Sequence, residues 1–386
     1  MILLFAIILG MVTACWYCGV IVFLYRGFHA LPPLGEPGNH RFSVIIAARN
    51  EAANIVSCLE SIFAQSIAPD RFEVIVVNDR STDTTAEIVT QLEHRFPNLS
   101  HLNIEATPTG VSPKKWAVAQ GVAQARHEII VFTDADCRVP ATWLETIDRA
   151  FTPSVGVVQG IASYRFTPGM NRLFFQLQSL DFLSHGIVAA AAIGARLPIN
   201  SNANNFAFRL DAFHTTGGLT GRISHIVSGD DDLLLQQIWK QKQWEIVYMT
   251  DSRGAVETMP TATIKALFHQ RARWGSKTVH YHLKQVILLA GIFGFYCLIA
   301  AIILLGCFYH RLLPIGGILL LVKYAGERLL MVPGLYRFGH QELLAVLPIA
   351  SLLHLPLILG AILTGTFGRF TWKDQSFSRT IKNRPD

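Results

Sequence analysis

Two aspartates one residue apart follow a strongly apolar run, and their spacing suits metal chemistry. The run Glu128–Phe132 is typical of a buried strand and leads directly to Asp134 and Asp136. On an extended backbone, side chains two residues apart project from the same face. In an open α/β sheet, ligands bind beyond the carboxyl ends of the strands. The pair could therefore hold a divalent cation at that edge of a sheet.

Further carboxylates stand at comparable places in the chain. Asp79 closes the apolar run 72–77, and Gly229 is followed by three aspartates, residues 230–232, at the start of a helical run. Taken singly, each of them has a simpler explanation. Asp79 could cap a turn or a helix, and the three aspartates could stabilise the N-terminus of a helix by their interaction with its dipole. Together they would lie on loops that open at the same edge of a parallel sheet.

Strands and helices alternate from residue 41 onward, and this order positions the acidic residues. It indicates a mostly parallel sheet with right-handed crossovers. No Gly-x-Gly-x-x-Gly turn follows a strand, which disfavours a dinucleotide-dependent oxidoreductase. The predicted strands are 42–48, 72–77, a short one near 102–104, 128–132, 155–160, one fed by a polar turn within 200–209, and 245–249. The predicted helices run to about residue 64 after the turn 50–54, to about residue 96 after residue 83, onward from 114–121, over 171–195 and from about 230.

The composition indicates a globular part between membrane segments. Of 386 residues, 51% are hydrophobic and 16% charged, and the apolar excess lies in residues 1–25 and in most of 285–366. The net charge of +6 comes partly from the C-terminal tail and suits an anionic membrane face. The chain lacks the interleaved aromatic and basic residues of a nucleic-acid binder, so we expect no nucleic-acid partner.

The first 25 residues predict a membrane anchor. A cleaved signal peptide is the alternative, but no basic segment precedes the apolar run and it continues past Cys15. Basic residues, Arg26 and Arg41, follow the run, so the positive-inside rule places the globular part in the cytoplasm.

The number of C-terminal spans is open between two and three. The runs 286–308 and 343–367 are each apolar enough to span a bilayer. The run 312–336 between them contains Lys323, Glu327 and Arg328, and it could span only if these charges pair inside a bundle.

Five motifs occur in an order that is similar to one family. They are S-V-I-I-A-A-R-N-E at 43–51, V-V-N-D at 76–79, T-D-A-D at 133–136, G-D-D at 229–231 and Q-R-A-R-W at 270–274. With them, the chain resembles the membrane-bound inverting glycosyltransferases of family 2, which include cellulose, chitin and hyaluronan synthases and ceramide glucosyltransferase. The resemblance implies an α/β fold of the GT-A type, a Rossmann-like, mostly parallel sheet domain flanked by N- and C-terminal transmembrane helices.

This resemblance and the apolar runs together predict the organisation of the chain. Its parts are an N-terminal transmembrane helix (1–25), a linker (26–40), a GT-A domain (41–260), an interfacial helix with the Q-x-x-R-W motif (261–284), C-terminal transmembrane helices (285–368) and a basic tail (369–386).

The resemblance also implies which residues bind the donor and a metal. Asp136 would be the more direct ligand of Mg²⁺ or Mn²⁺, with Asp134 beside it and also facing the donor. Lys114 matches the lysine that meets the diphosphate charge, and Lys115 is the alternative. The residues implied to hold the donor nucleoside are Ala47, Arg49, Glu51 and Asp79.

Catalysis and acceptor binding are assigned in the same way. Asp231 matches the general base, and Asp230 is the alternative because the aspartate triplet leaves the register open by one position. Asn205 would lie near the acceptor. The residues implied to close over donor and acceptor are Gln270, Arg273 and Trp274.

These assignments predict transfer from a nucleotide sugar to a lipid or glycan acceptor by an enzyme of the inner membrane. A diphosphate leaving group needs cations, and an acceptor hydroxyl needs a carboxylate base. One base opposite the leaving group gives a single displacement with inversion. The alternatives are a processive polysaccharide synthase, a non-catalytic nucleotide-binding membrane scaffold and a nucleotidyltransferase. A nucleotidyltransferase would not explain the Q-R-A-R-W segment.

Overall fold

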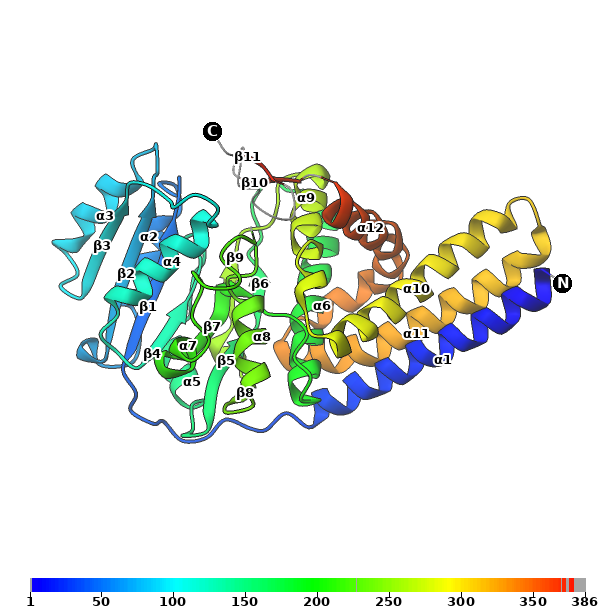
Figure 1. Cartoon of the computed structure of the whole chain (residues 1–386), viewed down its shortest axis with the longest axis horizontal. Coiled ribbons are helices and arrows are strands. Elements are labelled where there is room, and N and C mark those ends of the chain that lie inside the picture. The colour runs from blue at the N-terminus through cyan, green and yellow to red at the C-terminus, as the bar shows by residue number, and fades with distance from the viewer. Residues whose placement is uncertain (1, 227, 369, 373–374, 378–386) are drawn as a thin grey trace. The chain divides into compact units, whose positions relative to one another are not determined.

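A seven-stranded sheet with the strand order β3-β2-β1-β4-β7-β5-β8 organises the globular part of the chain (Figure 1). The computed structural model describes residues 2–226, 228–368, 370–372 and 375–377, so most of the predicted basic tail lies outside the described residues. Only β7 runs antiparallel to its neighbours. The strands are β1 (Phe42–Ala48), β2 (Phe72–Asp79), β3 (Leu99–Ile104), β4 (Ile129–Phe132), β5 (Val155–Gly160), β7 (Phe206–Arg209) and β8 (Glu245–Met249). The predicted α/β class and mostly parallel sheet are confirmed.

The chain divides into two compact units, which we describe separately. The sheet unit comprises Leu31–Gly169 and Asn200–Pro260. The helical unit comprises Met1–Ala30, Met170–Ile199 and Thr261–Ser376. The division therefore takes the segment 170–199 out of the predicted contiguous domain 41–260 and groups it with the helices.

Short helices flank the strands of the sheet unit. One of them, α4, packs against β1 and β2 so closely that a Cβ atom at Gly121 would lie 2.7 Å from Ile45 Cγ2 and 2.8 Å from Val77 Cγ2. A small pair, β6 (Ala162–Tyr164) and β9 (Val256–Thr258), forms a second sheet. The helices are α2 (Ile55–Phe63), α3 (Thr85–Glu93), α4 (Pro113–Gln124), α5 (Trp143–Asp148), α7 (Leu210–His214) and α8 (Asp232–Gln241).

The strand directions bring several loops to one edge of the sheet. Parallel pairing places the carboxyl ends of β1, β2 and β4 together. Because β7 is antiparallel, its first residue, Phe206, pairs with Phe132 at the end of β4. The chain therefore enters β7 at the same edge at which it leaves the three parallel strands. Asp79 lies at the end of β2, and Asp134 and Asp136 follow the end of β4.

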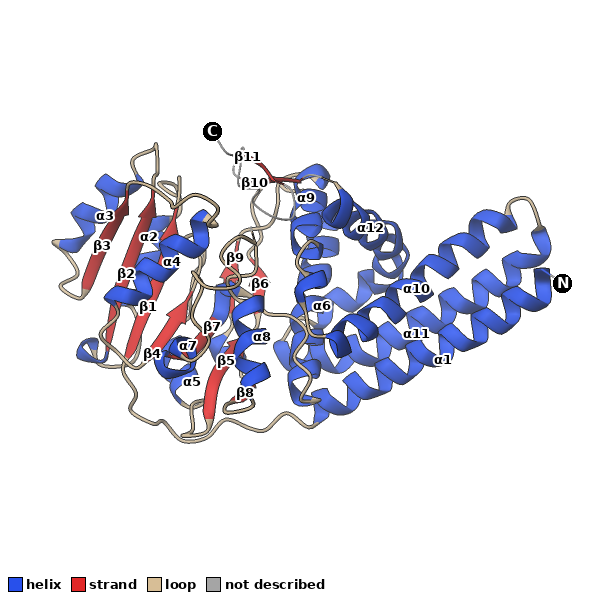
Figure 2. Cartoon of the chain, in the orientation of Figure 1, coloured by secondary structure: helices blue, strands red, loops and turns tan. Residues whose placement is uncertain are grey.

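Helices dominate the second unit (Figure 2). They are α1 (Ile2–His29), α6 (Arg172–Gly194), α9 (Ile264–Gly275), α10 (Leu283–Gly306), α11 (Leu313–Phe338) and α12 (Leu347–Phe367), with a short pair β10 (Phe370–Trp372) and β11 (Gln375–Phe377) after them. Among the described residues, four segments are long and apolar enough to cross a membrane: Leu3–His29, Arg172–Gly194, Leu283–Gly306 and Gln341–Thr366. In the apolar part of Arg172–Gly194, 61% of the residues are buried inside the structure, against 28% in each of the other three segments, so this helix is the most internal of the four.

The charged helix α11 packs with α1 and α10, and two of its charged residues, Lys323 and Glu327, are paired inside the unit. Lys323 is fully buried, and its ammonium group donates to Glu327 Oε1 at 2.5 Å and to the carbonyl oxygen of Ser351 at 2.7 Å. The Ser351 hydroxyl also donates to Glu327, and His354 Nδ1 lies 3.6 Å from the same carboxylate. A polar group in an apolar bundle needs such partners, so the pairing explains how Lys323 and Glu327 are tolerated inside the helical unit.

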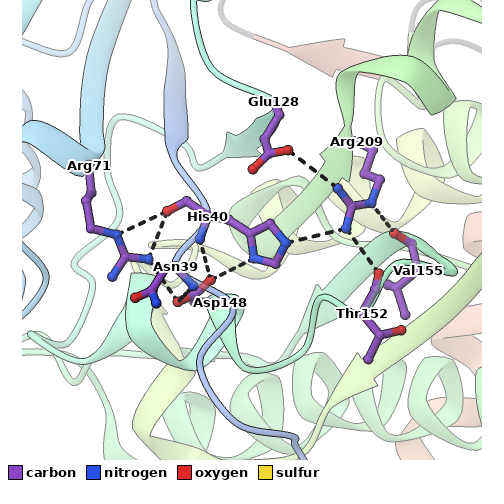
Figure 3. A network of polar contacts seen from close by, with 8 residues as sticks. All are labelled: Asn39, His40, Arg71, Glu128, Asp148, Thr152, Val155 and Arg209. Atoms are coloured by element: carbon purple, nitrogen blue, oxygen red, sulfur yellow. Dashed lines mark hydrogen bonds and ion pairs between the residues drawn. The ribbon is translucent and has the colours of Figure 1, made fainter.

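A buried carboxylate ties the linker to the sheet unit at the start of β1 (Figure 3). Asp148 accepts hydrogen bonds from the backbone amides of Asn39 and His40 at 3.1 and 3.0 Å, and it pairs with Arg71 at 2.9 Å. His40 Nδ1 lies 2.8 Å from the same carboxylate. On the other side of the ring, the guanidinium of Arg209 donates to the carbonyl oxygens of Val155 and Thr152.

These contacts set the acidity of Asp148. Burial raises the pKa of its carboxyl, but the hydrogen bonds from Arg71 and His40 outweigh burial and hold the pKa below its usual value. A group whose pKa is depressed in the folded state stabilises that state above its unfolded pKa, and this stability is lost as the pH falls through the folded pKa.

We therefore expect Asp148→Asn to destabilise the protein in a pH-dependent way. Leaving Arg71 and two amides without the charge should cost about 3 kcal/mol at pH 7, or roughly 5–10 °C in apparent melting temperature. The difference from the wild type should shrink as the pH falls below about 4. Asp70→Asn, at an exposed aspartate beside Arg71, is the control and should leave the melting curve unchanged. A difference that stays constant down to pH 3 would contradict the assignment.

Candidate active site

One lysine joins two of the predicted acidic loops. Lys114 Nζ, at the N-terminal end of α4, lies 3.0 Å from Asp134 Oδ1 and 3.0 Å from Asp230 Oδ2. Burial lowers the pKa of the Lys114 ammonium, but the carboxylates of Asp134 and Asp230 outweigh burial and hold its pKa above the usual value. Burial likewise raises the pKa of Asp230, and Lys114 more than offsets that. The lysine therefore stays charged and draws the loop after β4 and the loop before α8 together.

The two carboxylates after β4 are half-buried and are held by neighbouring loops. Asp134 follows Phe132, the last residue of β4, and its backbone carbonyl accepts a weak hydrogen bond from Cys58 Sγ at 3.6 Å. Asp136 Oδ1 accepts from the Thr258 hydroxyl, at the end of β9, at 3.3 Å. Cys137 Sγ lies 3.7 Å from the same oxygen, and burial raises the pKa of this thiol. Burial also raises the pKa of the Cys58 thiol, so both thiols stay protonated and the two aspartates are the acids of this loop.

The carboxylate oxygens of this loop fit a divalent cation that is bound partly by the protein and partly by a substrate. Within the described part of the chain, no group of three or more His, Cys, Asp or Glu side chains is arranged to hold a metal. Mg²⁺ commonly binds through one or two carboxylates, with substrate phosphates and water completing its shell. Asp136 and Asp134 supply oxygen ligands of that kind, and Lys114 adds a positive charge for an anionic ligand.

The aspartate triplet serves more than one structural purpose. Asp231 is the N-cap of α8, and its Oδ1 accepts from the backbone amide of Asp232 at 2.7 Å. Asp232 is almost fully buried and accepts a hydrogen bond from the amide of Ser201. A carboxylate offers about four acceptor positions, so capping a helix does not prevent Asp231 from accepting a proton. The capping expected of these acids and a catalytic role for one of them are thus compatible.

The loops after β1 and β2 are bonded to each other. The amide of Asn50 donates to Ser81 Oγ at 3.0 Å, and the side-chain oxygen of Asn50 accepts from the amide of Thr82 at 2.8 Å. The amide of Glu51 donates to Thr85 Oγ1 at 2.9 Å. Asn50 and Arg80 both have a φ angle of 54°, so the two loops turn sharply as they leave the strands.

These two loops carry the residues predicted to hold a nucleoside. Ala47 lies in β1, and Arg49 and Glu51 follow it. Asp79, the last residue of β2, is buried and pairs with Arg80 at 2.8 Å. Arg80 was not among the predicted site residues, although it directly follows Asp79 in the sequence. All four predicted residues lie at the edge of the sheet that also carries Asp134.

Two of the predicted site residues, Lys115 and Asn205, are buried and bond to groups of the protein interior. Lys115 is 1% exposed, and its ammonium group donates to the carbonyl oxygen of Ile223 at 2.8 Å. Asn205 is also buried: its Oδ1 accepts from Trp143 Nε1, and its Nδ2 donates to the carbonyl oxygens of Ile161 and Gly254. Of the two lysines, Lys114 is therefore the one beside the carboxylates. Asn205 connects four segments of the interior. Its hydrogen bonds therefore indicate a structural role and not a direct contact with an acceptor.

The remaining predicted residues, Gln270, Arg273 and Trp274, lie on α9 in the helical unit. They share the last turns of this helix with Arg271, whose guanidinium lies 4.2 Å from the centre of the Trp274 ring. Thr263 is the N-cap of the helix, and its hydroxyl oxygen accepts a hydrogen bond from the amide of Ala266.

The sequence is similar to those of several known glycosyltransferases and sugar-polymer or glycolipid synthases. The chain is 26% identical to the glycosyltransferase AglE of Haloferax volcanii over 65% of this chain and 77% of the relative. It is 27% identical to a beta-monoglucosyldiacylglycerol synthase of Synechocystis sp., over 60% of this chain and 46% of the relative. It is 24% identical to a poly-beta-1,6-N-acetyl-D-glucosamine synthase of Staphylococcus epidermidis, over 60% and 53%. The chain thus spans only about half the length of the two synthases.

A solved structure and a family model extend the agreement. A mannosyltransferase of Pyrobaculum calidifontis, determined with GDP-Man and Mn²⁺, matches 90% of this chain and 98% of its own with a TM-score of 0.55 and 19% identity, which supports the fold. The family model described as "Glycosyltransferase like family 2" matches residues 39–276, well over half of the chain. The sheet edge with its paired carboxylates is therefore that of a GT-A domain, and the chain belongs to glycosyltransferase family 2.

Proposed function

We propose that this protein is a membrane-embedded inverting glycosyltransferase that moves a sugar from a nucleotide-sugar donor to a lipid or glycan acceptor. The observation that carries the proposal is the contact of Lys114 with both Asp134 and Asp230. It brings a candidate metal pair and a candidate base loop to one edge of the sheet, together with a fixed positive charge. A donor diphosphate needs the cation, and an acceptor hydroxyl needs the carboxylate.

In the proposed reaction, Asp231 accepts the proton of the acceptor hydroxyl while that oxygen attacks the anomeric carbon. The bond between this carbon and the donor diphosphate breaks, and the diphosphate leaves with its electron pair. A single displacement of this kind inverts the anomeric centre. Lys114 counters the charge that grows on the leaving group. Mg²⁺ or Mn²⁺, held by Asp136 and Asp134, would supply further charge neutralisation on the diphosphate oxygens.

The loops after β1 and β2 are proposed to hold the nucleoside, with Arg49, Glu51 and Asp79 as its polar contacts and Ala47 beneath it. Their mutual hydrogen bonds fix this part of the edge before a donor arrives. Preorganised contacts of this kind spare the reaction the cost of ordering loops around the substrate.

We further propose that the helical unit holds the protein in the inner membrane, with the sheet unit in the cytoplasm. Support comes from the apolar helices and from the basic residues Arg26 and Arg41 after the first of them. The names of two relatives suggest acceptors, a glycerolipid for one and a growing polysaccharide for the other. A processive synthase therefore stays the second candidate.

The decisive experiment is a screen of radiolabelled nucleotide sugars on membranes that contain the protein, with and without EDTA. We expect one donor to label a lipid or glycan product, EDTA to abolish the transfer, and Mg²⁺ or Mn²⁺ to restore it. Membranes from cells that lack the protein are the control. Product length separates the two candidates, because a single transfer yields short products and a synthase yields polymer. Transfer that persists in EDTA would overturn the metal role of Asp136 and Asp134.

The base assignment predicts that Asp231→Asn slows transfer by about 10²–10⁴-fold, because the amide cannot accept the proton. The amide keeps an oxygen that can cap α8, so the melting temperature and the donor KM should change little. Asp230→Asn, which weakens the pair with Lys114, should instead raise the donor KM. If Asp230→Asn gives the larger loss in kcat, the base is Asp230 and the register is shifted by one residue.

The two adjacent lysines form a matched pair. Lys114→Met should lower kcat/KM by about 10²-fold, because it removes a positive charge from the leaving-group side. Lys115→Met should leave kcat/KM nearly unchanged but lower the melting temperature, because it removes the bond to Ile223. Steady-state kinetics and thermal unfolding of both variants test the assignment. A reversed pattern would place Lys115 at the diphosphate.

A further inference from the structure

A second arginine lies inside the Q-R-A-R-W segment, and the proposed reaction does not use it. Arg271 is 3% exposed, and its Nε donates to Asp181 Oδ2 of α6 at 2.5 Å. Its second nitrogen, Nη1, donates to Gln270 Oε1 at 2.5 Å. The same guanidinium lies over the ring of Trp274 at 4.2 Å. One buried side chain thus contacts both Gln270 and Trp274 and connects them to another helix.

The helix α6 supplies a matching face. Asp181 and His185 are four residues apart and therefore lie on the same side of the helix. The ring of His185 meets Trp274 edge to face at 5.3 Å, and the ring of Phe182 lies 6.0 Å from it. Trp274 is thus held between aromatic rings of α6 and the guanidinium that Asp181 anchors.

The other side of α9 packs against α12 through small residues. The backbone at Gly365 lies directly against the carbonyl of Ala272, and a Cβ atom at Gly275 would lie 3.5 Å from Ile362. Close backbone packing fixes the distance between α9 and α12, but small residues offer little that sets the direction of the larger side chains. On the side of α6, a charged pair and aromatic rings meet Trp274 and can set that direction.

The chemistry of the guanidinium suits this task. It is planar and always charged, it donates in several fixed directions, and it stacks on aromatic faces. A lysine could pair with Asp181 but could not present a plane to Trp274 while donating to Gln270. A buried arginine is costly without a carboxylate partner, so the position of Arg271 depends on Asp181.

We propose that Arg271, anchored by Asp181, is a positioning residue that fixes the side chains of Gln270 and Trp274 for sugar transfer. The inference rests on the proposed function and on the role that the sequence predicts for Gln270 and Trp274, which is to close over donor and acceptor. Asp181 acts through the guanidinium of Arg271, which it anchors and which in turn contacts Gln270 and Trp274.

A spectroscopic test follows Trp274 without relying on activity. The full-length protein is labelled with 5-fluorotryptophan in detergent, and the ¹⁹F signal of Trp274 is identified by its loss in Trp274→Phe. We expect Asp181→Asn to shift or broaden this signal. The matched control is Gln178→Ala: Gln178 lies one turn earlier on α6, is also buried, and bonds to Thr261 before α9. It should leave the Trp274 signal in place.

A kinetic test uses the same variants together with one that keeps no buried charge. Asp181→Leu combined with Arg271→Met removes both partners, which a folded protein tolerates better than the loss of one. We expect kcat to fall about 10- to 100-fold in this variant and in Asp181→Asn, with the donor KM unchanged. Asp181→Glu, which keeps a carboxylate, should recover part of the rate, and Gln178→Ala should keep kcat.

The outcomes separate this inference from the proposed function. An unchanged Trp274 signal in Asp181→Asn, or an equal loss of kcat in Gln178→Ala, would overturn the positioning role. A wild-type protein that transfers no sugar would overturn the proposed function, and the fluorine comparison would still decide whether Asp181 and Arg271 fix Trp274.

Discussion

The geometry of the candidate site depends on one charge balance, a lysine ammonium between two carboxylates. Asp134 and Asp230 come from loops that are far apart in the sequence, and two partly buried carboxylates would repel each other without a cation between them. Lys114 can reach both because α4 lies tightly against β1 and β2, which in turn requires a residue without a side chain at Gly121. The placement of the acids thus goes back to the packing of one helix on two strands.

Much of the fold follows from local patterns. The strands Phe42–Ala48 and Val155–Gly160 were predicted to the residue, because continuous apolar runs between polar turns leave few alternatives to a buried strand. Asp134 and Asp136 were also placed correctly, just beyond the end of a strand. These features depend only on neighbours in the sequence. The short strands β6 and β9 carry no such pattern, and they exist because each pairs with the other.

The remaining features depend on contacts that the sequence does not record. Lys114 and Lys115 are adjacent, and only the face by which α4 packs decides that one meets carboxylates and the other a backbone carbonyl. The polar side chain of Asn205 was compatible with a ligand contact, but its partners Trp143, Ile161 and Gly254 come from distant segments. The charges of α11 interrupted an apolar run, and the residue that receives Lys323 is Ser351, on another helix.

Buried charged pairs fix the orientation of helices in the helical unit, just as Lys114 and its two carboxylates fix the loops of the sheet unit. Apolar side chains pack against apolar surroundings in almost any rotation, so hydrophobicity alone does not fix how a helix turns about its axis in a membrane. A buried ion pair does, since a charge in such surroundings must meet its partner. Lys323 with Glu327 and Ser351 fixes α11 against α12, and Arg271 with Asp181 fixes α9 against α6. Because α9 carries Gln270 and Trp274, the two side chains that we propose to close over donor and acceptor would take their orientation from the ion pair of Arg271 with Asp181.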